Sequence, residues 1–305
     1  MNRLRLISLG ALLALPAMAP LRAAVDPGLL ELAPPDSRLL IGVEVQQALA
    51  SPFGHFALAQ VPGQSAVLLQ LAATTGFDVR RDLREILVAG HGQKGKLLRG
   101  GVLLARGAFQ MDRLLVFAEK IHATVSNYGG IPLITPSDAG ADTIAIIDSS
   151  TLAVGSESAV KEIVNRRAQR FLFSGPLADK ALAVSANAGV WAATVTPLGS
   201  LIPPSSSGVW PVGFLQAILE SSAGLRFDTD GVTVSAEALT HSAQEASALA
   251  GMFKIVTGLL KGPQGGILQG ARFTTEGAAT HLSLTVAEPD LERAFPVPAQ
   301  KRAAR

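Results

Sequence analysis

Residues 74–87 read TTGFDVRRDLREIL, and this stretch joins an apolar run typical of a helix to the start of a strand. Gly76 marks a turn between the two, because glycine adopts backbone conformations that other residues avoid. Most of the local charge follows that turn, and the apolar residues that resume at Leu83 are typical of a strand. The stretch therefore predicts a joint between a helix and a strand.

A second stretch, SSAGLRFD at 221–228, has the same order of helix end, glycine and strand start. Gly224 follows Gly76 by 148 residues, and a strand-like run at 190–195 follows another at 39–45 by 151 residues. A steady offset over this distance predicts an internal duplication. In each half we expect a strand, a helix, two strands, a long helix and then further strands.

Hydrophobic periodicity supplies the remaining elements. Helices are expected at 111–123, at 157–168 and at 214–222, and Ser242 with Glu245 forms a capping box that opens another. Short turns separate most of the predicted strands, so the sheets should be largely antiparallel with helices on one face. We therefore predict an α+β fold of two related domains, 25–172 and 173–295, followed by a disordered basic tail at 296–305.

The N-terminal residues 1–24 have the features of an export signal. Arg3 and Arg5 precede the apolar run 6–15, and small residues follow Pro16. The run is too short to span a bilayer, which takes about 20 residues. We predict cleavage near Ala24 and a periplasmic or extracellular protein; because Arg22 lies close to that point, an uncleaved N-terminal anchor is the alternative.

Composition excludes several classes of function. The chain has no cysteine, so disulfides, thiolate metal sites and a cysteine nucleophile are excluded. Six of its 26 basic residues lie in the predicted signal and tail, which leaves 20 against 24 acidic residues in the body. A nucleic-acid surface is therefore not expected. No later run is long and apolar enough to predict a transmembrane helix in the mature chain.

Two loops have the residue spacing of ligand-binding motifs but lack the flanking elements or ligand residues that those motifs need. Residues 90–96 contain the spacing of a phosphate loop, but a strand rather than a helix follows them, and Leu97 stands where serine or threonine is needed. Residues 228–237 resemble part of a calcium loop, but Arg226 occupies its first ligand position. Each is better explained as a hairpin turn. The five histidines are scattered, so we predict no metal, cofactor or catalytic residues.

Six charges lie close together in the opening stretch. One interpretation makes Asp78, Arg80, Arg81, Asp82 and Arg84 a charged surface for a partner. The interpretation we favour makes them a solvated turn, because exposed ion pairs are common and weak.

The segment 201–212 has no counterpart in the first half. Its apolar residues could dock a partner or a membrane surface. Alternatively, Trp210 folds back onto its own domain. The candidate partner-binding residues are Ile202, Pro203, Pro204, Val209 and Trp210.

Three groups of turn and packing residues resemble those of an uncharacterised group of bacterial exported proteins. They are Pro35-Asp36, Ser51-Pro52-Phe53-Gly54, and Thr75-Gly76-Phe77-Asp78 through Asp82-Leu83. The resemblance implies a signal peptide and duplicated α+β halves across most of the mature chain. It implies no activity and no ligand.

These observations predict an exported, non-enzymatic protein that binds another protein or the cell envelope. Two alternatives stay open: a carrier of an apolar ligand or lipid, in a cleft between the halves or between helix and sheet, and a hydrolase whose active site is assembled from distant residues. The sequence leaves the oligomeric state open.

Overall fold

A computed structural model describes residues 24–51, 74–92, 101–138, 140–169, 171–201, 215–228, 231–260 and 262–294. Three predicted features lie outside this part of the chain: residues 1–23 of the signal peptide 1–24, the tail 296–305, and the loop residues Ile202, Pro203, Pro204, Val209 and Trp210.

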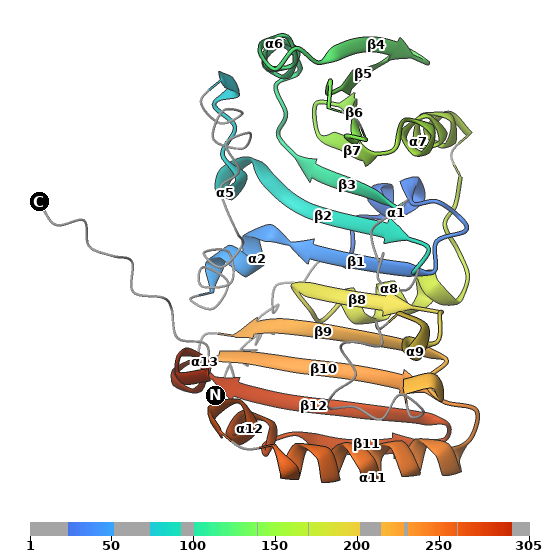
Figure 1. The fold of residues 1–305 in the computed structure, drawn as a ribbon, viewed down its shortest axis with the longest axis vertical. Helices are drawn as coiled ribbons and strands as arrows, with labels where there is room; N and C mark the ends of the chain where they lie inside the picture. Colours follow the sequence, from blue (N-terminus) through green and yellow to red (C-terminus); the bar gives the residue numbers. More distant parts are fainter. Residues whose placement is uncertain are drawn as a thin grey trace, which may run out of the picture.

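The described residues form one antiparallel sheet of twelve strands (Figure 1). The strands are β1 Leu39–Glu44, β2 Leu83–Gly90, β3 Val102–Gly107, β4 Thr124–Tyr128, β5 Ile131–Thr135, β6 Thr143–Asp148, β7 Thr151–Gly155, β8 Val190–Thr194, β9 Glu220–Asp228, β10 Gly231–Leu239, β11 Arg272–Glu276 and β12 Ala279–Ala287. Their order across the sheet is β11-β12-β10-β9-β8-β1-β2-β3-β7-β6-β5-β4.

Alternation along the strands gives the sheet two apolar faces, because successive side chains point to opposite sides. In β2, Leu87 and Ala89 lie on one side and Ile86 and Val88 on the other. We call the side of Leu87 the first face and the side of Val88 the second face. Since both are apolar, both need cover, and helices lie on both rather than on one as predicted.

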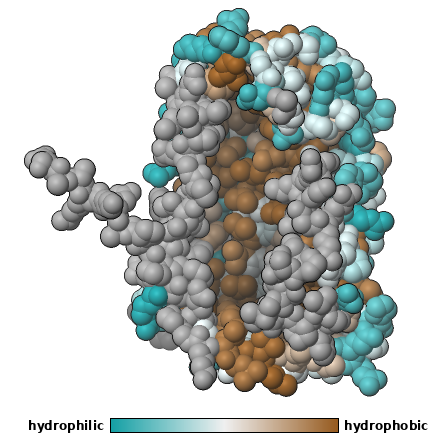
Figure 2. All heavy atoms as spheres, viewed as in Figure 1, coloured by the Kyte–Doolittle hydropathy of each residue, from teal (hydrophilic) through white to brown (hydrophobic). Residues whose placement is uncertain are grey.

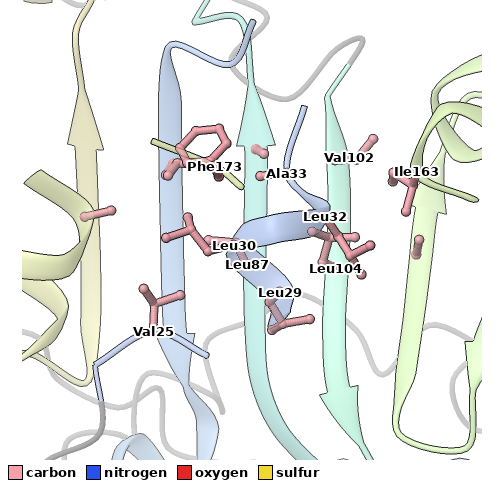
Figure 3. Close-up of a cluster of buried hydrophobic side chains, with 14 of the residues drawn as sticks. Val25, Leu29, Leu30, Leu32, Ala33, Leu87, Val102, Leu104, Ile163 and Phe173 are labelled. Carbon is pink, nitrogen blue, oxygen red and sulfur yellow. The ribbon is translucent and has the colours of Figure 1, made fainter. Parts of the chain in front are cut away.

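Three helices cover the first face: α1 Pro27–Leu32, α7 Glu157–Gln169 and α8 Pro176–Ser185. Asp26 begins α1, since its Oδ1 accepts the Leu29 N–H at 3.1 Å. Figure 3 shows this core, in which Leu29, Leu87 and Leu104 are fully buried. Two i,i+4 ion pairs lie on α7, with Lys161 Nζ at 2.6 Å from Glu157 Oε1 and Arg166 Nη2 at 2.8 Å from Glu162 Oε1. The first face is therefore solidly packed near the centre of the sheet.

The second face carries helices near both ends of the sheet. Towards the β4 end lies α6 Met111–Lys120, while α2 Val45–Ala50 lies against β1 and β2, with the short exposed α5 Val79–Asp82 beside it. Towards the other end lie α9 Leu198–Leu201, α11 Ala243–Leu259, α12 Gly262–Leu268 and α13 Glu288–Ala294. The predicted cap of α11 is confirmed, because Ser242 Oγ accepts the Glu245 N–H at 3.2 Å.

The two halves meet at the pair β1–β8, which makes them one sheet. Each half has two further strands beyond this pair, then a helix and a returning hairpin: β2, β3, α6 and β6–β7 in one, β9, β10, α11 and β11–β12 in the other. The first half also has the hairpin β4–β5 between α6 and β6. This order agrees with the predicted duplication, which stays a prediction. The α+β antiparallel fold is confirmed, whereas a division into two domains is not.

One part of the predicted joint is wrong. Gly76 lies at a turn with a φ of +69°, but Gly224 lies inside β9, paired with Ser235. Strand β9 already begins at Glu220, so the predicted helix 214–222 does not extend to Ser222. Gly224 packs where a Cβ would be 2.7 Å from that of Ala188, so it serves close packing of the first face and not a turn.

Candidate functional site

An apolar cavity of about 420 Å³ lies between the second face of the sheet and helices α9, α11 and α12. Its floor comes from β8, β9, β10 and β12, and α11 forms one wall. This volume is in the range of small-molecule sites in proteins, which is about 300–1,000 Å³.

The floor is hollow because three adjacent strands place alanines side by side. Ala192 of β8 pairs with Ala223 of β9, which pairs with Ala236 of β10. On the same strands, the next pairs along bring larger residues together, such as Leu225 with Val234. A methyl side chain fills little of the space beneath a helix, so the alanine row leaves the cavity.

The walls are aliphatic and aromatic. Phe253 of α11 stacks on Phe273 of β11 with ring centroids 5.6 Å apart. Ile218, Leu268 and Leu282 complete the apolar surroundings. These side chains offer dispersion contacts and no directional hydrogen bonds.

The threonine hydroxyls that line the cavity already have partners in the backbone. Thr194 Oγ1 donates to the Arg38 carbonyl at 2.9 Å, and Thr280 Oγ1 donates to the Ala246 carbonyl at 2.9 Å. Thr257 Oγ1 donates to the Phe253 carbonyl at 2.8 Å. Because these donors are satisfied within the protein, they do not favour a polar ligand.

The charged residue next to the floor points away from the cavity. Glu237 follows Ala236 along β10, so its side chain lies on the first face. There its Oε1 lies 3.2 Å from Nζ of Lys180, a residue of α8. Lys180 Nζ also lies 3.3 Å from Glu220 Oε2. These three charged side chains pair with one another on the first face and do not place a charge in the cavity.

The corresponding region of the first half is filled. There the second face packs against α6 through Leu114 and Ala118, and Phe77 stacks on Phe109 at 5.6 Å. Ala105 and Ile146 of the sheet are nearly fully buried beneath them. The cavity is therefore a property of the second half and not a general consequence of this architecture.

The cavity opens over Ala223. This residue lies on a central strand, yet its side chain is exposed. Figure 2 shows the surrounding surface as an apolar hollow that runs across the middle of the molecule. A ligand could therefore reach the cavity from this face.

The predicted charged surface forms a short capped turn. Asp78 Oδ1 accepts the Arg80 N–H at 2.8 Å, and Asp82 Oδ2 accepts the Asp78 N–H at 2.9 Å. Arg81 Nε lies 2.6 Å from Asp82 Oδ1, and Arg84 is exposed on β2. These contacts are what the favoured interpretation expects, since the carboxylates cap α5 and pair locally.

The motifs that resembled ligand loops belong to hairpins. Strands β2 and β3 pair across the phosphate-loop-like segment, of which 93–96 lies outside the described residues. Strands β9 and β10 pair across the calcium-like segment, where Arg226 Nε binds the Asp228 carboxylate at 3.0 Å. Within the described ranges no group of three or more His, Asp or Glu residues could hold a metal ion.

A buried carboxyl group lies on the first face, away from the cavity. Glu85 of β2 is 7% exposed, and its two oxygens accept the Asp26 N–H at 3.2 and 3.1 Å. Burial raises the pKa of Glu85 to about 7, and the carboxylates of Glu44 and Asp26 contribute. Arg106 holds Asp26 through its Nη2 at 2.7 Å from Oδ1. The cluster fastens the start of α1 to the sheet.

This burial makes stability depend on pH. Because the pKa of Glu85 is higher in the folded state than its usual 4.5, the folded protein binds more protons and loses stability as pH rises from about 4.5 to 7. The expected loss is about 3 kcal/mol. Glu85→Gln has no carboxyl group at this position, so its free energy of unfolding should fall less between pH 5 and pH 8 than that of the wild type. Urea unfolding at the two pH values would measure this difference. Glu157→Gln at an exposed pair is the control, and identical pH slopes for all three proteins would contradict the assignment.

Sequence reasoning missed the cavity residues. The alanines are single residues on three strands, and although β9 and β10 form a hairpin, β8 lies about 30 residues earlier, so only strand pairing brings all three together. The one available signal was small residues at alternate positions of strands, such as Ala236 and Ala238.

Across the described ranges, no helix combines the length and the apolar character needed to cross a membrane.

No protein-family model and no curated protein matches the chain. Solved structures of TP0453, a protein of the bacterium Treponema, are similar in fold. Its crystal form III has a TM-score of 0.58 at 10% identity and covers 90% of this chain and 98% of that chain. Its crystal form I has a TM-score of 0.52 at 11% identity and covers 88% and 96%. The chain therefore shares its overall fold with TP0453.

Proposed function

We propose that the protein is a non-enzymatic carrier of an apolar ligand, which it holds between helix α11 and the second face of the sheet. One observation carries this proposal: a cavity of about 420 Å³ whose floor is the row Ala192, Ala223 and Ala236 and whose threonine hydroxyls bond to the backbone. Burial of hydrocarbon there would be favourable by about 25 cal/mol per Å² of apolar area.

The ligand class follows from the cavity's chemistry. A ligand with hydrogen-bonding groups deep inside would leave them without partners, at a cost of about 1–3 kcal/mol for each group. A hydrocarbon chain has no such groups. We therefore infer a lipid or fatty acid whose acyl chain enters the cavity while its polar end stays outside.

Export is part of the proposal, and it is supported by the basic and apolar pattern of residues 1–24. A carrier in the periplasm or outside the cell would move lipid through water. The loop around Trp210 lies outside the described residues, so its role in binding a protein or the cell envelope stays a prediction.

Titration with cis-parinaric acid, a fluorescent fatty acid, tests the proposal. We expect saturable binding at one site and displacement by palmitate. Fluorescence that does not saturate, or that palmitate does not displace, would contradict a specific acyl-chain site.

A further inference from the structure

The alanine floor of the cavity continues across the centre of the sheet. Six directly paired residues on the second face form what we call the central apolar row: Leu103 of β3, Val88 of β2, Ile41 of β1, Ala192 of β8, Ala223 of β9 and Ala236 of β10. The three alanines line the cavity, whereas the other three lie beyond it.

The side chains along this row are less deeply buried than those on the opposite face of the same strands. Ile41, Val88 and Leu103 are each only half-buried. Leu40 and Leu87, which lie on the first face of the same strands, have an exposed fraction of 0%. Partly exposed apolar residues in the middle of a large sheet indicate a surface that binds something apolar.

A second row of apolar residues lies beside the first on the same face, and it is covered at one end, where Ala105 is buried beneath α6. It consists of apolar residues in direct pairs on the same six strands: Ala105, Ile86, Val43, Val190, Leu225 and Val234. Neither row contains a polar or charged side chain. Six strands at about 4.8 Å spacing make each row about 24 Å long.

We propose that the central apolar row is the second part of the ligand site and holds one long acyl chain that leaves the cavity over Ala223 and runs across Ile41 and Val88 to Leu103. This inference rests on the proposed function. A peptide in the same place would bring backbone N–H and C=O groups that these side chains cannot satisfy, whereas a hydrocarbon chain has none. The row is continuous with the cavity, so one chain can occupy both.

The proposal predicts a dependence on chain length. We expect octanoate to lie within the cavity and palmitate, whose chain is twice as long, to extend onto the row. In the double variant Ile41→Thr/Val88→Thr each substitution adds a hydroxyl to the row, and threonine suits a strand, so the fold should be kept. We expect palmitate to bind about tenfold more weakly to this variant and octanoate to bind as to the wild type.

Isothermal titration calorimetry of both acids, with thermal unfolding as a check on folding, tests this. Val116→Thr, at a half-exposed valine of α6, is the matched control and should change neither affinity. If the double variant binds palmitate normally, or loses both acids equally, the row is not a separate part of the site, although the cavity proposal stands. If the wild type binds neither acid, both proposals fail.

Discussion

Replacing Gly42 with alanine is expected to destabilise the protein by about 3 kcal/mol, because it overpacks the centre of the sheet. Gly42 of β1 pairs directly with Trp191 of β8, where the two halves meet. An added Cβ would lie 2.2 Å from Cε2 of Trp191, and the ring is 4% exposed, so it has little room to move.

Two further variants make this prediction specific. Gly258→Ala in α11 meets no atom within 4 Å, so it should stabilise the protein by about 0.5–1 kcal/mol. Trp191→Leu removes the ring, so the double variant with Gly42→Ala should lose less than the sum of the single variants. Urea unfolding gives the free energy of unfolding of the three single variants and the double variant. A loss below 1 kcal/mol for Gly42→Ala, or additive losses, would show that the ring does not restrict this site.

Replacing Ala236 with phenylalanine is expected to weaken binding of cis-parinaric acid at least about tenfold, since the ring would occupy space that the ligand needs. Ala236 lies in the middle of the cavity floor. The same substitution should leave stability nearly unchanged, because the new side chain enters empty space instead of a packed core.

The neighbouring residue provides the control. Ser235 is exposed on the opposite face of β10, so Ser235→Phe adds the same bulk outside the cavity and should keep wild-type affinity. Fluorescence titration and thermal unfolding of both variants give the comparison. Equal affinities for the two variants would place the ligand elsewhere.

The sequence predicted elements whose signals are local. Branched residues at 39–45 and after Leu83 predicted β1 and β2, and the Ser242–Glu245 pair predicted the start of α11. The N-cap and the strand pattern depend only on neighbouring residues, so they can be read without the fold.

Features that depend on long-range pairing could not be predicted. Gly224 resembled a turn residue in sequence, yet it is a packing residue in a strand, and this depends on Ala188 being opposite. The joining of the halves into one sheet depends on β1 pairing with β8, residues about 150 apart. The candidate site depends on the same pairing, since it sets Ala192 beside Ala223.

Native mass spectrometry of the protein, purified from the organism that makes it, shows directly whether the cavity holds an acyl chain. We predict a species heavier than the polypeptide by the mass of one apolar ligand, which organic solvent releases. Ala236→Phe purified in the same way should show the polypeptide mass alone. A wild-type protein that shows only the polypeptide mass, even after incubation with excess palmitate, would contradict the account of an acyl-chain carrier.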